Sequence, residues 1–236
     1  MYKLAIGLEI HTELLTQTKM FSASKNDANA EPNTCISPTD LGLPGTLPVA
    51  NKQAVILGIK LAKALEMEID PILQFDRKNY FYVDLPKGYQ ITQFYHPIGL
   101  NGILGNVKIE RIHLEEDTAK QTKNGDQIHL DYNRVGVPLI EIVTRPDITS
   151  KEQCLEFLTN LKRLLIHLGV SDGKMENGSL RVDLNISVSD SDTLGTRCEI
   201  KNLNSFSNIL DAIDYEFNRQ TKILEEGNQV ISETRR

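Results

Sequence analysis

The first strand-like stretch of the chain, Lys3–Leu14, carries two carboxylates and an imidazole at alternating positions. Glu9, His11 and Glu13 are each separated by one residue. In an extended strand their side chains therefore share one face and follow one another about 7 Å apart. Carboxylate oxygens and an imidazole nitrogen together can bind a divalent cation. An amphipathic edge strand with a solvated acidic face has the same spacing, so the pattern leaves both interpretations open.

A lone carboxylate, Glu141, stands inside an otherwise apolar stretch, Pro138–Pro146. Its sequence neighbours on both sides are Leu, Ile or Val. Burying an unpaired carboxylate is costly, so we expect Glu141 to face a cation, a cleft or water.

The stretch Leu180–Ser189 alternates cleanly and places four different polar groups on one face; these are Arg181, Asp183, Asn185 and Ser187. A mixed set of this kind fits a ligand-facing surface better than a solvent face. The following stretch, Cys198–Leu203, presents Glu199 and Lys201 together. Phosphoryl transfer needs carboxylates that bind Mg²⁺, and beside them Lys and Arg side chains that bind phosphate oxygens. The chain has no P-loop or protein-kinase motif, so a use of ATP would take place on an open sheet.

An aromatic run, Phe75–Tyr89, contains five Phe or Tyr residues interleaved with Arg77, Lys78 and Lys87. Such residues can stack on a base or an adenine ring. Packing across a sheet explains them equally well.

Many strands, antiparallel by their hairpin turns, and three helices are expected to position these groups. We expect a helix capped by Asn51 and running to about Met67, a second opened by Ser150 and stopped by Gly169, and a third over about 205–226. The alternating stretches Val107–Asp117 and Gln127–Asn133 indicate a hairpin through the turn at 124–126. This pattern predicts an α+β fold, with a large, mainly antiparallel sheet and helices packed on one face.

Composition narrows the class of protein. The 236 residues are 40% hydrophobic and 25% charged, with a formal net charge of -6. That charge argues against a domain that clamps nucleic acid by bulk electrostatics. The three cysteines, Cys35, Cys154 and Cys198, contain no C-x-x-C pair, so neither a zinc ribbon nor a disulfide framework is indicated. Free thiols and the lack of a leader-like segment at the start predict a cytoplasmic protein. A membrane span is not expected, because no apolar run approaches about 20 residues.

Seven stretches in order carry a resemblance: GLEIHTEL, FDRKNYFY, HLEEDTAK, DYNRVGVPLIEIV, GSLRVDLNIS, EIKNLNSF and ETRR. From about Leu4 to Arg236 the chain resembles the B-subunit family of the aspartyl/glutamyl-tRNA amidotransferases. The resemblance implies a single catalytic cradle domain over 1–236, related in fold to glutamine synthetase. It also implies that the helical and tail domains that follow in the family are absent.

The resemblance further implies an activity, a ligase reaction. ATP and Mg²⁺ would serve to phosphorylate the side-chain carboxylate of Glu or Asp misacylated on tRNA(Gln) or tRNA(Asn). Ammonia released by the amidase (A) subunit would then displace the phosphate and give Gln-tRNA(Gln) or Asn-tRNA(Asn), while a small (C) subunit straps the two larger chains together. Another ATP-dependent carboxylate ligase acting on a small molecule, or a scaffold that docks partners, are the competing hypotheses.

The residues implied fall into three sets. The metal ligands carried over from the family motifs are Glu9, His11, Glu116 and Glu141. The expected catalytic set is Lys78, Arg181, Asp183 and Lys201, and the expected nucleotide-binding set is Lys78, Tyr80, Asn185, Ser187 and Asn202.

One of the metal ligands conflicts with strict alternation. Alternation puts Glu116 on the face of Ile112 and Leu114, whereas Glu115 shares a face with His113. A bulge, an earlier strand end or Glu115 as the true ligand would each resolve the conflict.

Overall fold

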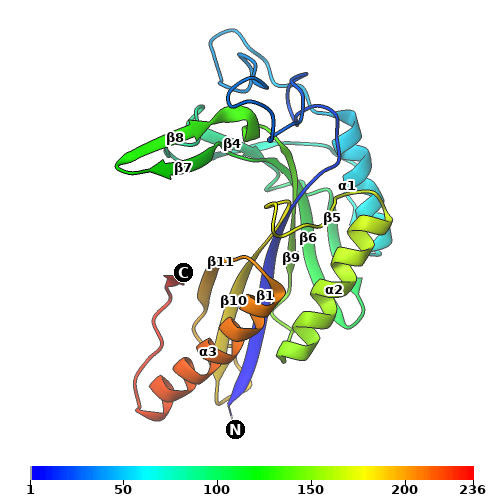
Figure 1. The fold of residues 1–236 in the computed structure, drawn as a ribbon. Helices are drawn as coiled ribbons and strands as arrows, with labels where there is room; N and C mark the ends of the chain where they lie inside the picture. Colours follow the sequence, from blue (N-terminus) through cyan, green and yellow to red (C-terminus); the bar gives the residue numbers. More distant parts are fainter. Residues whose placement is uncertain (1) are drawn as a thin grey trace.

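The computed structural model describes residues 2–236 and is built on one eight-stranded sheet with the order β12-β11-β10-β1-β9-β6-β5-β2 (Figure 1). Neighbouring strands are antiparallel except β11 and β12, which are parallel. The strands of this sheet are β1 (Lys3–Glu13), β2 (Glu68–Ile69), β5 (Gly99–Leu104), β6 (Val107–Glu116), β9 (Pro138–Thr144), β10 (Leu180–Ser189), β11 (Cys198–Leu203) and β12 (Thr234–Arg235). The sheet confirms the predicted α+β class with a large, mainly antiparallel sheet.

Two small ribbons accompany the main sheet. One pairs β3 (Asp76–Asn79) with β4 (Tyr89–Thr92), and the other pairs β7 (Lys120–Asn124) with β8 (Gln127–Asp131). The β7–β8 ribbon projects from the body of the molecule (Figure 1). The expected hairpin between Val107–Asp117 and Gln127–Asn133 is therefore wrong in its partner, because β6 pairs with β5 and β9 while β8 folds back on β7.

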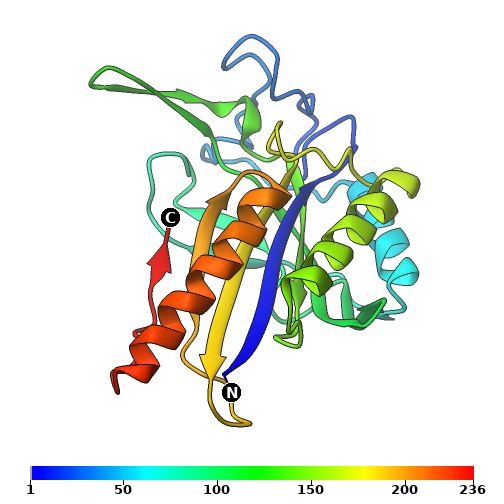
Figure 2. The ribbon, with the colours of Figure 1, turned by 60° about the horizontal axis from the view of Figure 1, so that its bottom comes forward.

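Three helices cover one face of the sheet, as Figure 2 shows for α2 and α3. They are α1 (Lys52–Ala64), α2 (Lys151–His167) and α3 (Phe206–Glu225). Buried side chains of all three join the apolar face of the strands in one core, which includes Ile6, Leu8 and Ile10 of β1. The alternation in β1 thus turns one face toward the helices and the other away from them.

The helix starts follow from their capping residues. Asn51 accepts hydrogen bonds from the backbone N–H groups of Gln53 and Ala54, and Ser150 and Ser205 each cap their helix in the same way. Helix α1 ends at Ala64, earlier than the expected Met67, because Glu66 turns into the left-handed region with φ 56°. No helix in the described part of the chain is long and apolar enough to cross a membrane.

Candidate active site

A row of polar residues crosses the face of the sheet that the helices leave uncovered. His11 on β1 lies directly opposite Glu141 on β9, and Glu141 lies opposite His113 on β6. On its other side His11 is opposite Arg181 on β10. Directly opposed residues on neighbouring strands point to the same face, so the pairing register itself assembles the site.

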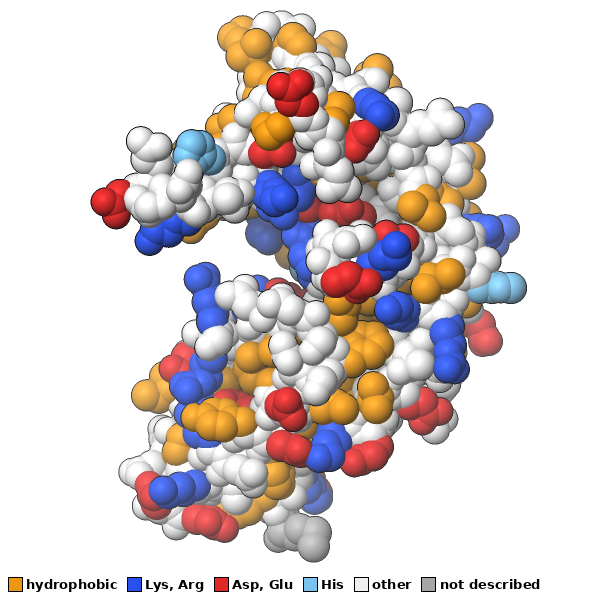
Figure 3. All heavy atoms as spheres, viewed as in Figure 1, with side chains coloured by type: hydrophobic (Ala, Val, Ile, Leu, Met, Phe, Trp, Pro, Cys, Tyr) orange, Lys and Arg blue, Asp and Glu red, His pale blue; other side chains and the backbone are white. Residues whose placement is uncertain are grey.

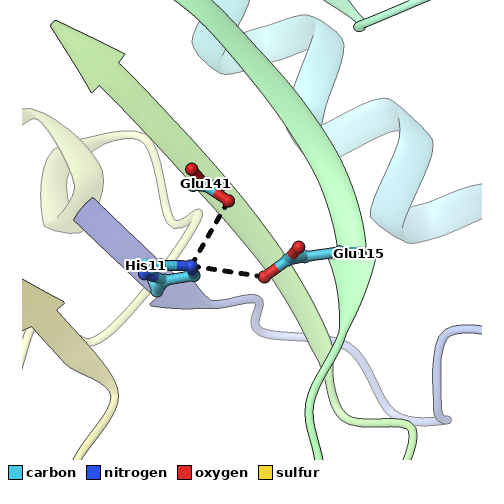
Figure 4. Close-up of side chains that lie close together, drawn as sticks. All are labelled: His11, Glu115 and Glu141. Atoms are coloured by element: carbon cyan, nitrogen blue, oxygen red, sulfur yellow. Dashed lines mark ion pairs between the residues drawn. The ribbon is translucent and has the colours of Figure 1, made fainter. Parts of the chain in front are cut away.

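Three of these side chains form a compact cluster of possible metal ligands. One ligand atom each of His11, Glu115 and Glu141 lies within 4.8 Å of the others (Figure 4). The His11 Nε2 atom is 3.4 Å from Glu115 Oε1 and 3.4 Å from Glu141 Oε2. One imidazole nitrogen and two carboxylates are a suitable donor set for a divalent cation that also binds water or phosphate oxygens.

Glu9 belongs to a second cluster on the same face. Its carboxylate lies with those of Asp183 and Glu199, again with one oxygen each within 4.8 Å. Lys201 Nζ lies 2.6 Å from Asp183 Oδ2 and 3.0 Å from Glu199 Oε1, and Asn185 Nδ2 donates to Glu9 Oε1 at 3.1 Å. Three of the expected metal ligands, Glu9, His11 and Glu141, are thus divided between two adjacent clusters.

Glu116 lies on the opposite face, so its expected place among the ligands is wrong. Pairing between β6 and β9 runs without a shift from Arg111 to Glu116, and therefore no bulge turns Glu116 around. Its buried carboxylate pairs with Lys87 and accepts a hydrogen bond from the Ile91 N–H at 3.0 Å. Glu115 takes the expected place instead, the third of the possibilities that strict alternation left open.

The cluster controls the charge of its own members. Burial would raise the pKa of Glu141, but hydrogen bonds and charge interactions with His11 and His113 outweigh it and hold that pKa well below its usual range. Burial would lower the pKa of His113, yet the contacts with Glu115 and Glu141 outweigh it and raise this pKa to about 9. The pKa of His11 is also raised, since Glu141 and Glu115 overcome its burial. A cation that binds to His11 Nε2 requires the neutral imidazole, so the raised pKa of His11 makes the cation and a proton compete for this side chain.

A pocket of about 560 Å³ lies over both clusters. Its opposite wall comes from the β3–β4 ribbon and the segment after it, with Arg77, Lys78, Phe94 and Tyr95 among the lining residues. Phe94 and Tyr95 are each 72% exposed, and their backbone N–H groups donate to Asp76 Oδ2 at 2.7 and 3.1 Å. In the space-filling view the surface is hollowed between the β7–β8 ribbon and the part near β11, with basic side chains at the rim (Figure 3).

Comparison with known proteins places this chain in a family. The family model described as GatB/GatE catalytic domain matches residues 4–236. The chain belongs to the GatB/GatE catalytic domain family. Two proteins named as the B subunit of aspartyl/glutamyl-tRNA(Asn/Gln) amidotransferase, from Mycoplasmopsis agalactiae and Malacoplasma penetrans, are each 54% identical over the whole of this chain. The chain covers 52% and 50% of these two proteins, or about half of their length.

Within this GatB/GatE domain, the expected catalytic residues do not all reach the pocket. Lys78, Asp183 and Lys201 line it. Lys78 takes part in no ion pair within residues 2–236 and lies 6.0 Å from the ring centre of Tyr80. Arg181 is not among the lining residues, since its guanidinium pairs with Asp117 at 2.6 Å.

The expected nucleotide-binding residues are also spread out. Asn185 contacts Glu9 at the edge of the second cluster, and Tyr80 lies beside Lys78 with its pKa raised to about 12 by burial and nearby carboxylates. Ser187 lies opposite Ala5 and lines a different hollow, which argues against its expected contact with a nucleotide. Asn202 is exposed and has φ 64°.

Sequence reasoning missed one residue of this GatB/GatE site, His113, and put Glu13 on the same strand face without showing that it lies outside the site. In the sequence, His113 was noted only because it shares a strand face with Glu115. The spacing of two residues between them is the signal that could have placed His113 in the site. Glu13, the last polar group of β1, lines a separate hollow of about 310 Å³ with Arg134 and Asp172. Burial and the nearby Asp117 raise its pKa to about 7.

Proposed function

We propose that this chain catalyses the ATP- and Mg²⁺-dependent activation of the side-chain carboxylate of Glu-tRNA(Gln), Asp-tRNA(Asn) or both. The observation that carries the proposal is the cluster of His11, Glu115 and Glu141, which opens on the same pocket as Lys78 and Lys201. The relatives' printed name, which is that of an aspartyl/glutamyl-tRNA(Asn/Gln) amidotransferase, supports the substrate class.

In this proposal each wall of the pocket has its own task. The His11 cluster, together with Glu9 and Asp183, has the oxygen and nitrogen donors to hold Mg²⁺, which when bound would neutralise phosphate charge. Lys78 and Lys201 carry positive charge toward the same space and would bind phosphate oxygens as charge develops in the transition state. A carboxylate oxygen of the substrate would form the new bond to the γ-phosphorus, with ADP as the leaving group. In the second step ammonia would attack the acyl carbon, phosphate would leave, and the nitrogen would lose a proton.

Exposed aromatic rings on the far wall fit a nucleotide-bearing substrate. Phe94 and Tyr95 are largely exposed and line the same pocket as Arg77, and exposed rings of this kind can stack on bases. Of the expected nucleotide-binding set, Lys78, Tyr80 and Asn185 remain proposals for ATP. For Asn202 we propose instead a backbone role at the bulge of β11. The relation of the cradle to glutamine synthetase is also a proposal.

The reaction requires partners that supply ammonia and substrate. We propose an assembly with the amidase (A) subunit, which would release the ammonia, and the small (C) subunit, which would hold the larger chains together. The assembly would act in the cytoplasm on the misacylated tRNA. The relatives are named as one subunit of an amidotransferase, and this supports a multi-chain enzyme.

The test is single-turnover transfer of the ATP γ-phosphate to Glu-tRNA(Gln) by the complete complex, with glutamine omitted so that the amide step cannot mask it. Glu141→Gln is expected to abolish transfer, and Lys78→Met to slow it about a hundredfold, the usual cost of removing one electrostatic contact to the transition state. Lys63→Met, which alters an exposed lysine on α1, is the matched control. Wild-type transfer by folded Glu141→Gln protein would refute the proposal. Equal transfer to free glutamate would instead favour a small-molecule carboxylate ligase.

A further inference from the structure

His113 lies beside the metal-ligand cluster but outside the set of ligand atoms. It comes from β6, two residues before Glu115 and directly opposite Glu141. Its side chain is only 7% exposed. The group of ligand atoms that all lie within 4.8 Å of one another contains His11, Glu115 and Glu141 and leaves His113 out.

Two histidines contact the same pair of carboxylates. His113 Nε2 lies 3.1 Å from Glu141 Oε2 and 3.6 Å from Glu115 Oε2, whereas His11 approaches Glu115 through its other oxygen, Oε1. Glu115 has a further support, because Thr92 Oγ1 donates to Oε2 at 3.3 Å. Within residues 2–236, the polar side-chain contacts of the Glu141 carboxylate are those with His11 and His113.

This division matters once His11 gives its nitrogen to a cation. His11 Nε2 is the atom that faces both carboxylates, so a cation between them would replace its contact with Glu141. His113 would then be the remaining side chain in the described structure that fixes Glu141. A carboxylate ligand commonly depends on such a neighbouring donor for its orientation.

His113 is also incompletely satisfied as a purely structural residue. Its Nδ1 atom is buried and has no hydrogen-bond partner among the described residues. A buried polar atom without a partner is unusual and requires an explanation, because an apolar side chain at the same place would avoid the cost. An imidazole at this position is explained if its other nitrogen, Nε2, is needed for its contacts with Glu141 and Glu115.

We propose that His113 is a positioning residue for the metal site: its Nε2 atom holds Glu141, and with Thr92 also Glu115, so that their remaining oxygens and His11 can bind a divalent cation. The inference rests on the proposed function, because it assumes that the cluster binds a metal. It assigns His113 no direct bond to the metal.

The test measures Mn²⁺ binding to the complete protein by electron paramagnetic resonance and counts imidazole nitrogens on the bound ion by pulsed experiments. His113→Gln keeps an amide N–H near the position of Nε2, whereas His113→Asn places its amide near Nδ1 and loses that contact. Loss of such a supporting residue weakens metal binding about 10- to 100-fold. We therefore expect a Kd at least about tenfold weaker for His113→Asn and a Kd within about threefold of wild type for His113→Gln.

The controls separate this inference from the proposed function. His129→Asn alters an exposed histidine on β8 and is expected to bind Mn²⁺ like wild type. One imidazole nitrogen is expected on Mn²⁺ in wild type and in both His113 variants, and none in His11→Gln. His113→Phe, which lacks any donor, replaces His113→Asn in the comparison if the latter does not fold.

Three results would overturn the inference. Wild-type affinity of folded His113→Asn or His113→Phe, with binding lost in His11→Gln, would show that His113 supports nothing. Two imidazole nitrogens on Mn²⁺ in wild type, with one lost in His113→Gln, would make His113 a ligand. Wild-type affinity of His11→Gln would remove the metal from this cluster, and the proposed function would fail with it.

Discussion

Arg181 and Asp117 form a two-pronged ion pair next to the polar face of the sheet. Arg181 Nη2 lies 2.6 Å from Asp117 Oδ2, and Nη1 lies 3.4 Å from Oδ1. The Asp117 side chain is 5% exposed and that of Arg181 is 38% exposed. The guanidinium, expected from sequence to grip a phosphoryl group, thus has a protein carboxylate as its partner.

This pairing predicts that substitutions at either residue affect stability more than chemistry. Asp117→Asn should lower the free energy of unfolding by about 2 kcal/mol, less than for a fully buried pair because Arg181 reaches solvent. Arg181→Lys keeps the positive charge but cannot contact both Asp117 oxygens through two nitrogens, so it should lower the free energy of unfolding by about 1 kcal/mol. Urea unfolding measures both. We expect single-turnover phosphorylation by Arg181→Lys within about threefold of wild type; a hundredfold fall would restore Arg181 as a catalytic residue.

The opposite orientations of two consecutive glutamates give a second prediction. Glu115→Gln should weaken Mn²⁺ binding at least about tenfold, because it removes a charged oxygen donor from the cluster. Glu116→Gln should leave Mn²⁺ binding intact, yet destabilise the protein by about 3 kcal/mol, because Lys87 would stay buried without its ionised partner. Mn²⁺ titration and thermal unfolding of both variants provide the comparison. If folded Glu116→Gln protein lost Mn²⁺ while Glu115→Gln kept it, the assignment would be reversed.

Local patterns in the sequence are sufficient to predict the strands that carry the site. The alternation in β1 and β10 indicates both their bounds and their polar faces, since side-chain direction in a strand depends only on position. The same rule puts Glu115 on the face of His113, but from the sequence alone a bulge or an earlier strand end stays possible, and the family motif points to Glu116. Capping by Asn51, Ser150 and Ser205 likewise depends on the adjacent backbone alone.

Long-range pairing cannot be read in the same way. The strand order decides that Glu9 joins Asp183 and Glu199, while His11 joins Glu141 and Glu115. The hairpin prediction fails for a similar reason, because two alternating stretches near a turn do not show which partner each will choose. The second wall of the pocket comes from the β3–β4 ribbon, whose approach to the sheet depends on contacts between segments far apart in the chain.

A third prediction concerns the pH dependence of stability through Glu216 on α3. This buried carboxylate accepts hydrogen bonds from Arg219 Nη2 at 2.6 Å and Gln220 Nε2 at 2.8 Å. Burial would raise the pKa of Glu216, but these contacts outweigh it and lower the pKa from 4.5. A folded-state pKa below the unfolded value contributes stability that is present above the unfolded pKa and is lost as the pH falls through the folded pKa.

Glu216→Gln should therefore lower the free energy of unfolding by about 2 kcal/mol at pH 7, a typical value for hydrogen bonds to a charged group. The difference in unfolding free energy from wild type should shrink as the pH falls from 4.5 through the lower folded-state pKa, where the wild-type carboxyl also becomes neutral. Urea unfolding at a series of pH values measures this, with the exposed Glu225→Gln on the same helix as the control. A difference that stays constant down to acid pH would show that packing, and not charge, is lost in the variant.

The last prediction concerns the bulge that directs Lys201 into the site. Val182 pairs with Leu203 and Leu184 with Ile200, so two residues of β11, Lys201 and Asn202, oppose one residue of β10. Such an extra residue bends a strand and re-aims its side chains. Asn202 accommodates the bulge with φ 64°, a conformation that Gly adopts freely and that a β-branched residue strongly disfavours.

Asn202→Gly and Asn202→Val test whether the backbone or the side chain of this residue matters. Asn202→Gly should keep stability within about 0.5 kcal/mol and keep the single-turnover phosphorylation rate, since the left-handed conformation costs Gly nothing. Asn202→Val should lose about 1 to 2 kcal/mol and react more slowly, because relieving the strain moves Lys201 away from Asp183 and Glu199. A direct contact between the Asn202 amide and ATP gives the opposite order: Asn202→Gly would then raise the ATP requirement as much as Asn202→Val does. Comparing the ATP dependence of the two variants therefore decides whether Asn202 acts through Lys201 or binds the nucleotide itself.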